Sequence, residues 1–131
     1  MYLAIDYGKK RIGLAIGEKM ARGFGVLENS PEVIDEIVEK CRAEQIEKII
    51  IGLPKREDGT DGGMGAQIRS FAALLERSAS LPVIFEEESF TSVEAERLLG
   101  ENGVDISKDK AKVDELSAVL ILEQYINAEN R

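Results

Sequence analysis

The sequence predicts an α/β fold in which a mixed β-sheet is covered by helices on both faces. Two patterns predict this class. Three apolar runs with short connections fill the first 28 residues, as in an antiparallel meander. Two later apolar runs alternate with helical patterns, as strands joined by crossover helices do. The length of 131 residues suits a single domain over residues 1–131.

The first three strands are predicted from alternating and continuous apolar residues. Leu3 and Ile5 alternate with their neighbours in a first strand that ends at Asp6. A turn leads to a second strand over residues 11–17, and a third is expected over residues 23–28.

A helix should follow the meander. Ser30 and Pro31 form a favourable helix start, an N-cap residue before a proline at the first helical position. The apolar residues behind them keep helical spacing: Val33, Ile34, Ile37, Val38 and Cys41. The next run, KIIIGLP at 48–54, is typical of a central strand buried on both faces.

The second half continues this alternation. Residues 55–65 hold four glycines among charged residues, and we expect this loop to be mobile and to become ordered over a bound strand. A helix with its apolar face between Ile68 and Leu75 follows, and then a buried strand over residues 81–86. Thr91 or Ser92 should cap a helix that runs through Leu99, and a final helix is expected over residues 113–127.

Composition excludes several classes of protein. The 44% hydrophobic and 32% charged residues are those of a soluble domain, and no apolar run reaches the roughly 18 residues of a membrane span. With no signal segment visible, the cytoplasm is the expected location. The net charge of −8 argues against coating nucleic acid by bulk attraction, so any such contact needs local basic patches and bound metal.

The residues available for chemistry are restricted as well. The chain has no histidine and a single cysteine, Cys41, whose place in a helical pattern indicates packing. A histidine base and a histidine-ligated zinc are therefore excluded. Oxygen-ligated metals such as Mg²⁺ or Mn²⁺ remain as cofactors.

Carboxylates are predicted to meet at one edge of the sheet. Asp6 ends the first strand, and the run EEES at 86–89 ends the last one. Asp114, placed in the first turn of the final helix, shares an apolar stripe with Ala118 and Ile121. Each acid alone is more often a solvated loop residue or a partner of the helix dipole. Their coincidence at one edge favours a shared metal.

Four segments resemble the YqgF family, also called RuvX, whose members are described as Holliday-junction-resolvase-like proteins and as pre-16S rRNA nucleases. They are AIDYGKKRIGLAIG, IIIGLPKREDGTDG, FTSVEAERLL and KVDELSAVLILEQYI, in the family's order and across nearly the whole chain. The resemblance implies an RNase H-like fold with a five-stranded mixed sheet and helices on both faces. It also implies a metal-dependent phosphodiesterase site built from Asp6, Glu88 and Asp114.

The sequence departs from the family at one motif. Where the family has Asp-Glu-Arg, this chain has Glu87, Glu88 and Ser89, so the metal-binding glutamate is kept and the arginine is lost. Strand alternation places Glu86 and Glu88 on one face and turns Glu87 to the other. Three carboxylates suffice without histidine, because two Mg²⁺ ions about 3.5 to 4 Å apart can activate water and stabilise an in-line displacement.

Basic residues near the same edge are candidates for phosphate contact. The residues that we expect to bind substrate are Lys9, Lys10, Arg11, Lys55, Arg56 and Thr91. A third basic cluster precedes the last helix, at Lys108, Lys110 and Lys112. It fits a solvated face as well as a substrate contact.

Several functions stay open at this point. The main hypothesis is a nuclease that processes the 5′ end of pre-16S rRNA in ribosome biogenesis. A resolvase for four-way DNA junctions is the alternative within the same chemistry, and it would need a homodimer with two sites. A small phosphotransferase is disfavoured, because sugar kinases with a similar Asp-x-Gly hairpin need two such domains. A catalytically silent ribosome- or transcription-associated binding module would fit the acidic charge and the missing arginine.

Overall fold

The computed structural model describes residues 1–54, 64–88, 92–105 and 108–130. The strands are β1 (Tyr2–Tyr7), β2 (Arg11–Gly17), β3 (Ala21–Glu28), β4 (Lys48–Leu53) and β5 (Val83–Glu87). The helices are α1 (Val33–Ala43), α2 (Met64–Ala79), α3 (Ser92–Glu101) and α4 (Lys110–Glu129). Within these residues, no helix is long and apolar enough to cross a membrane.

The strands form one mixed sheet with the order β3-β2-β1-β4-β5. β1, β2 and β3 pair antiparallel as a meander, while β4 pairs parallel with both β1 and β5. β1 therefore lies between the meander and β4, which confirms the predicted position of the first strand. The carboxyl ends of the parallel strands β1, β4 and β5 share one edge of the sheet.

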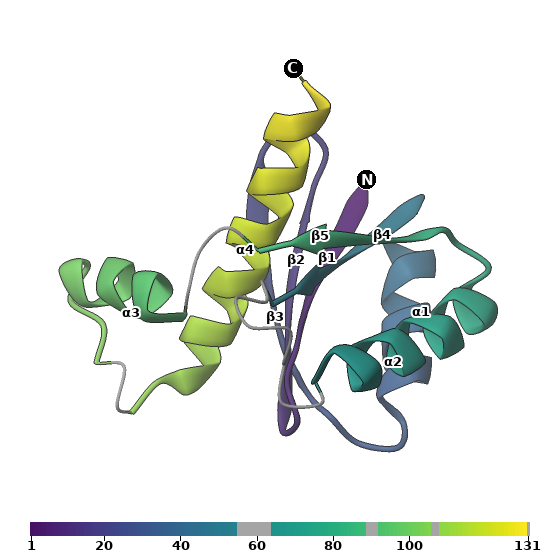
Figure 1. The fold of residues 1–131 in the computed structure, drawn as a ribbon, viewed down its shortest axis with the longest axis horizontal. Coiled ribbons are helices and arrows are strands. Elements are labelled where there is room, and N and C mark those ends of the chain that lie inside the picture. The colour runs from purple at the N-terminus through teal and green to yellow at the C-terminus, as the bar shows by residue number, and fades with distance from the viewer. Residues whose placement is uncertain (55–63, 89–91, 106–107, 131) are drawn as a thin grey trace.

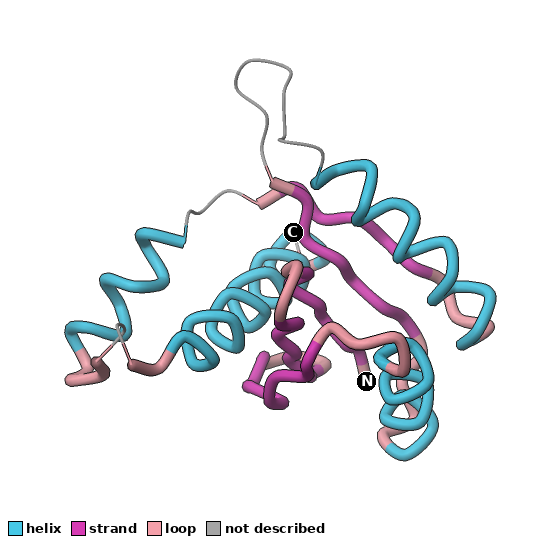
Figure 2. The backbone as a smooth tube through the Cα atoms, turned by 90° about the horizontal axis from the view of Figure 1, so that it is seen from below, coloured by secondary structure: helices cyan, strands magenta, loops and turns pink. Residues whose placement is uncertain are grey.

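Helices cover both faces of the sheet, as predicted. α1 and α2 lie on one face and α4 crosses the other, while α3 packs against α4 away from the strands (Figure 1, Figure 2). The larger core cluster joins α1 and α2 to one set of strand residues. The smaller cluster joins α4 to the opposite set and contains Ala4, Ala15, Ile50, Ala118, Ile121, Leu122 and Ile126.

Burial of apolar residues accounts for this layering. β1, β2 and β4 are central strands, and Ile5, Leu14 and Ile51 have no exposed surface. Small alanines face α4 from β1 and β2, which lets the long helix lie close to the sheet. Ala118 and Ile121 of α4 are likewise fully buried, so the apolar stripe predicted for the last helix does face the sheet.

Two predicted helix starts are wrong by a few residues. α1 begins at Val33 with Glu32 as its N-cap, whereas Ser30 accepts a hydrogen bond of 3.3 Å from the Glu32 backbone N–H within a preceding turn. α4 begins at Lys110 rather than at residue 113, because Lys110, Ala111 and Lys112 are good helix formers that extend it. Asp114 is therefore not a first-turn residue.

Other boundaries shift less. β3 begins at Ala21, where it pairs with Gly17, and β5 covers Val83–Glu87 rather than 81–86. α2 already begins at Met64, so the end of the predicted loop over 55–65 belongs to a helix. Residues 55–63 lie outside the described residues, and the predicted mobility of this loop stays a prediction.

Candidate active site

Asp6 lies at the end of β1 on the face that α4 covers. In the pairing of β1 with β2 it stands opposite Gly13, and paired residues share a face. A Cβ atom on Gly13 would overlap the backbone carbonyl of Asp114. Glycine at this position therefore lets the backbone of α4 touch β2 directly beside Asp6, which brings Asp114 to the same edge of the sheet.

Glu88 approaches the same face from β5, which is separated from β1 by β4. It follows β5 directly, and its backbone N–H donates a 2.8 Å hydrogen bond to the Leu53 carbonyl of β4. A Cβ atom on Gly52 would lie 2.7 Å from Glu88 Oε1 and 2.5 Å from Ile121 Cδ1 of α4. The Glu88 side chain thus extends over β4 on the α4 face.

The three acids interact electrostatically. The pKa of Asp6 is raised to about 8, first by burial and then by the charges of Glu88 and Asp114. Burial also raises the pKa of Glu88. The negative charges of Glu88 and Asp114 therefore act on Asp6, which lies in partly buried surroundings where solvent screens charges weakly.

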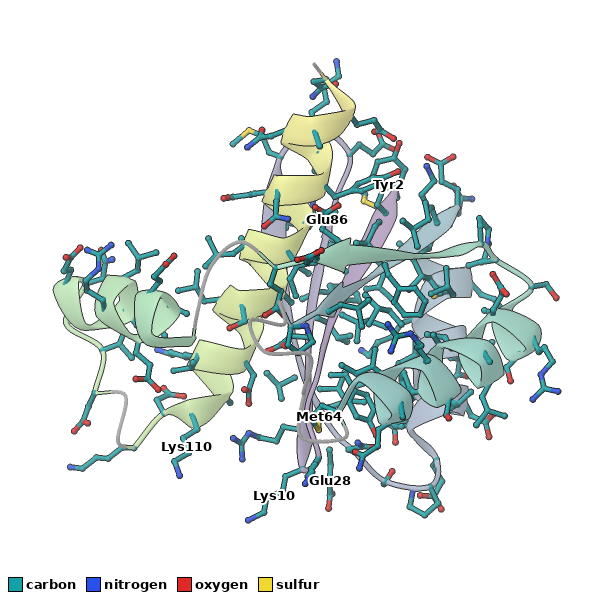
Figure 3. All side chains as sticks on the ribbon, in the orientation of Figure 1. Tyr2, Lys10, Glu28, Met64, Glu86 and Lys110 are labelled. Carbon is teal, nitrogen blue, oxygen red and sulfur yellow. The ribbon has the colours of Figure 1, made fainter. Side chains whose placement is uncertain are left out.

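The neighbours of Glu88 alternate as predicted. Gln124 of α4 donates a hydrogen bond of 2.5 Å to Glu86 Oε2 and one of 2.6 Å to the Glu87 carbonyl. Glu86 is labelled near α4 in Figure 3, whereas the Glu87 side chain is exposed. Glu86 and Glu88 hence lie on the face of the sheet that carries Asp6.

Arg11 forms an ion pair with one of the three acids. Its Nε donates a 2.7 Å hydrogen bond to Asp114 Oδ2, and the Arg11 and Asp114 side chains are 37% and 24% exposed. Sequence reasoning expected Arg11 to contact substrate and did not foresee this ion pair. Lys9 and Lys10 are exposed in the turn before β2, and Lys10 is labelled in Figure 3.

The other basic candidates make no ion pair with the three acids in the part of the chain that the structure describes. Lys108 and Lys112 form surface ion pairs with Asp105 and Asp109, at 4.0 Å and 3.6 Å. Lys110, the first residue of α4, is exposed (Figure 3). The other predicted substrate contacts lie outside the described residues: Lys55, Arg56 and Thr91.

The donor atoms at the edge fit a hard divalent cation. Asp6, Glu88 and Asp114 offer only carboxylate oxygens, the ligands that Mg²⁺ and Mn²⁺ prefer. The charges of Glu88 and Asp114 disfavour a negative charge on Asp6, and a bound cation would offset this repulsion. Among the described side chains, however, no three acids are yet arranged to hold one ion.

Some residues that build the site were missed by sequence reasoning. Gly13 and Gly52 make room for α4 and Glu88, and glycines inside strand patterns were the available signal. Glu115 accepts a 2.6 Å hydrogen bond from the Gly25 backbone N–H and so ties α4 to β3. Gln124 had no signal, because its two acceptors are distant in the sequence.

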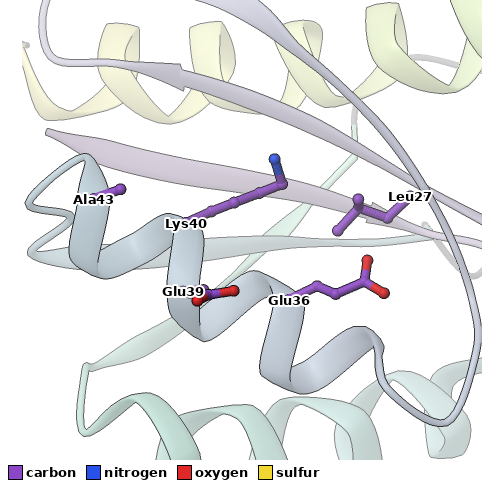
Figure 4. A pocket seen from close by; sticks show the side chains of 5 residues that line it. All are labelled: Leu27, Glu36, Glu39, Lys40 and Ala43. Atoms are coloured by element: carbon purple, nitrogen blue, oxygen red, sulfur yellow. The ribbon is translucent and has the colours of Figure 1, made fainter.

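A separate groove lies on the opposite face of the sheet. It runs between β3 and α1 and is lined by Leu27, Glu36, Glu39, Lys40 and Ala43 (Figure 4). None of the three acids lines it. This groove is therefore separate from the three acids.

Comparisons with known proteins agree with this arrangement. Residues 1–128 match the family model RuvX, described as Holliday junction resolvase. A protein of Koribacter versatilis, named "Putative pre-16S rRNA nuclease", is 41% identical over 95% of this chain and 84% of its own length. One of Halothermothrix orenii with the same name is 36% identical over 98% and 96%.

Solved structures show the same fold at low sequence identity. Thermus thermophilus RuvC in complex with a Holliday junction substrate gives a TM-score of 0.60 at 13% identity, covering 98% of this chain and 95% of that one. The fowlpox virus resolvase with Holliday junction DNA gives 0.58 at 10% identity, covering 99% of both chains. The solved structures thus show that this chain has the RNase H-like fold of RuvC. Because the family model matches residues 1–128, this chain belongs to the RuvX family.

Proposed function

We propose that this chain is a metal-dependent nuclease that hydrolyses phosphodiester bonds in structured RNA, with the 5′ end of pre-16S rRNA as its target. The observation that carries the proposal is the raised pKa of Asp6, caused in part by Glu88 and Asp114. The charges of Glu88, which follows β5, and of Asp114, on α4, act on Asp6 at the carboxyl edge of the sheet. Functional sites are where such shifts concentrate. The names of the relatives supply the RNA target.

The three acids are the proposed ligands of Mg²⁺ or Mn²⁺, in a two-metal site. When bound, the ions would activate water and stabilise the charge that develops on the transferred phosphate. Asp6 would contribute a ligand from a rigid central strand, and Glu88 and Asp114 would close the site from both sides. The chain needs no histidine base for this chemistry, and it has none.

Binding of the substrate strand is assigned to basic residues. Lys9 and Lys10 are exposed in the turn that follows β1, next to Asp6 in the chain. Their ammonium groups would hold the phosphates that flank the cleaved bond and fix the register of the strand. Lys55, Arg56 and Thr91 are proposed to add further contacts. Because the chain carries a charge of −8, these contacts and the metal must overcome a repulsive background.

A second candidate is resolution of four-way DNA junctions, favoured by the description of the family model. Junction resolution requires two cuts at matched positions, so this function would need a homodimer that presents two sites. A silent binding module is the third outcome, in which the acids would have no metal to hold.

Cleavage assays distinguish these functions. The purified chain is incubated with a 16S rRNA fragment that keeps its 5′ leader and, separately, with a four-way DNA junction, each with Mn²⁺ or with EDTA. We expect metal-dependent cleavage of the RNA that falls at least about a hundredfold in Asp6→Asn, since the variant loses a metal ligand. Glu87→Gln, which changes an exposed acid beside Glu88, is the control and should cut normally.

Each other result selects another function. Cleavage of the junction alone would support the resolvase. Cleavage that persists in EDTA or in Asp6→Asn would show that the three acids are not the active site. If neither substrate is cut and no Mn²⁺ binds, the silent module is the better account.

A further inference from the structure

Arg11 occupies an unusual place among the basic residues of this edge. It is the first residue of β2 and stands two positions before Gly13, so both lie on the face that α4 covers. Gly13 is opposite Asp6 and in contact with the backbone of Asp114. The guanidinium therefore pairs with Asp114 from the start of β2, whereas Lys9 and Lys10 are exposed in the turn.

The contact that Arg11 makes is specific. Its Nε donates to Asp114 Oδ2 at 2.7 Å, the short distance of a charge-assisted hydrogen bond. The pair is partly shielded from water, with Asp114 24% exposed. Among the described residues, the Arg11 guanidinium has Asp114 as its one side-chain acceptor, although it carries five N–H donors.

This ion pair competes with the proposed metal site for one carboxylate oxygen of Asp114. A metal shared by the three acids needs Asp114 as a ligand, and in the described structure no three acids are arranged around one point. The carboxylate of Asp114 is engaged by a cation that the chain itself supplies. A guanidinium and a divalent ion at the same carboxylate would repel each other strongly at short range.

We propose that Arg11 is a positioning residue that holds Asp114 in the metal-free protein, and that a divalent cation displaces it from Asp114 and frees it for the phosphate of the substrate. The inference rests on the proposed function, since it concerns the same acids. Arg11 supplies Asp114 with a countercharge while the site has no metal. Once displaced, its planar fork suits a phosphate, which accepts two parallel N–H bonds.

Mn²⁺ binding without nucleic acid tests the displacement. Calorimetry on EDTA-treated, dialysed protein compares the wild type with Arg11→Gln, which removes the competing cation. We expect Arg11→Gln to bind Mn²⁺ about twofold to fivefold more tightly, the range that the loss of one partly exposed ion pair allows. Arg11→Lys keeps a cation and should stay close to the wild type. Thermal melts check that each variant is folded.

A matched control is available on α3. Arg97 Nη1 pairs with Glu101 Oε1 at 2.6 Å, and neither residue belongs to the acid cluster. Arg97→Gln removes the same charge and breaks the same type of ion pair, so it measures the general effect of a lost positive charge. Its Mn²⁺ affinity should match the wild type.

RNA binding tests the second half of the proposal. Anisotropy of a labelled, structured RNA is measured with Ca²⁺ and with EDTA. With Ca²⁺, Arg11→Gln should bind about threefold to tenfold more weakly than Arg97→Gln, whereas in EDTA the two variants should bind equally. An equal deficit of Arg11→Gln in both conditions would show that Arg11 reaches phosphate without being displaced, and would overturn this half.

The outcomes separate this proposal from the function on which it rests. A wild type that binds no Mn²⁺ contradicts the proposed metal site itself. A wild type that binds Mn²⁺, together with an Arg11→Gln variant that binds it equally or more weakly, leaves the metal site intact and overturns the displacement, because Arg11 would then be neutral toward the metal or would support it.

Discussion

Asp6 is the residue at which folding and the proposed chemistry conflict. Its neutral form is favoured in the folded metal-free chain, because burial and the charges of Glu88 and Asp114 raise its pKa to about 8. In the unfolded chain its pKa returns to the ordinary value of 3.8. The folded state thus binds the proton more tightly, and its stability should fall as the pH rises from about 4 to about 8.

Asp6→Asn removes this penalty. In EDTA the variant should be more stable than the wild type, and the difference should grow between pH 5 and pH 8 to at least about 1 kcal/mol, since one pKa unit corresponds to about 1.4 kcal/mol. Thermal or urea unfolding at several pH values measures it. A wild type and a variant that keep the same stability difference at all these pH values would show that neither burial nor like charges raise the pKa of Asp6.

Only part of the proposed site could be predicted from the sequence. Asp6 and Asp114 could be proposed from a strand end and from an apolar helical stripe, and the resemblance to a family selected Glu88 among three successive glutamates. The ion pair of Arg11 with Asp114 could not be predicted, because it joins residues 103 positions apart. It depends on how closely α4 approaches β2, which local patterns do not determine.

At the scale of the elements, the close contact of α4 with β2 is what places Asp114. Gly13→Ala would press a methyl group into the backbone of α4 at Asp114, and a helix backbone cannot move aside as a side chain tip can. We expect a loss of about 1–3 kcal/mol in stability, typical of overpacking, together with weaker Mn²⁺ binding. Urea unfolding and calorimetry measure the two effects.

Gly100→Ala is the matched control for that substitution. Gly100 lies in α3, and a Cβ atom there would have no other atom within 4 Å. The variant should be as stable as the wild type or more stable by up to about 1 kcal/mol, since alanine favours a helix. Equal behaviour of Gly13→Ala and Gly100→Ala would refute the packing of α4 on Gly13.

The far end of α4 is fixed by a different set of contacts. Lys48 Nζ donates to the Tyr125 hydroxyl at 2.7 Å, and that hydroxyl donates to Glu129 at 3.0 Å. Tyr2 also donates to Glu129 at 3.1 Å, and its ring meets that of Tyr125 edge-on. These contacts join β1, β4 and α4 at the end of the sheet away from the acids.

Tyr125→Phe keeps the ring and removes both hydroxyl contacts. We expect a loss of about 1 kcal/mol in stability, the usual net value of such hydrogen bonds, with Mn²⁺ affinity unchanged. Unfolding by urea and calorimetry test this pair of results. A fall in Mn²⁺ affinity would mean that the position of Asp114 depends on the whole helix rather than on its contact with Gly13.

The element order was predictable because each element has its own local signal, whereas the boundaries were less so. The continuous apolar run of β4 and the helical spacing in α1 were both read correctly. The starts of α1 and α4 were not, since a serine before a proline can close a turn instead of a helix, and good helix formers extend a helix beyond its apolar stripe.

For the whole molecule, the mixed sheet follows from connection lengths. Short turns join the antiparallel strands β1, β2 and β3, whereas α1 connects β3 to β4 and α2 connects β4 to β5. β4 runs parallel to both β1 and β5. This topology gathers the carboxyl ends of the parallel strands at one edge, and α4 brings a third acid to that edge from the opposite end of the chain. The site is therefore a property of the complete fold.

The central claim is that Asp6, Glu88 and Asp114 form one metal site. Calorimetric titration of Mn²⁺ into the wild type, Asp6→Asn, Glu88→Gln, Asp114→Asn and the control Glu87→Gln tests it most directly. The account predicts that the wild type and Glu87→Gln bind alike, and that each of the other three loses at least about tenfold in affinity. Normal Mn²⁺ binding by Asp6→Asn, or a loss confined to one of the three variants, would contradict it.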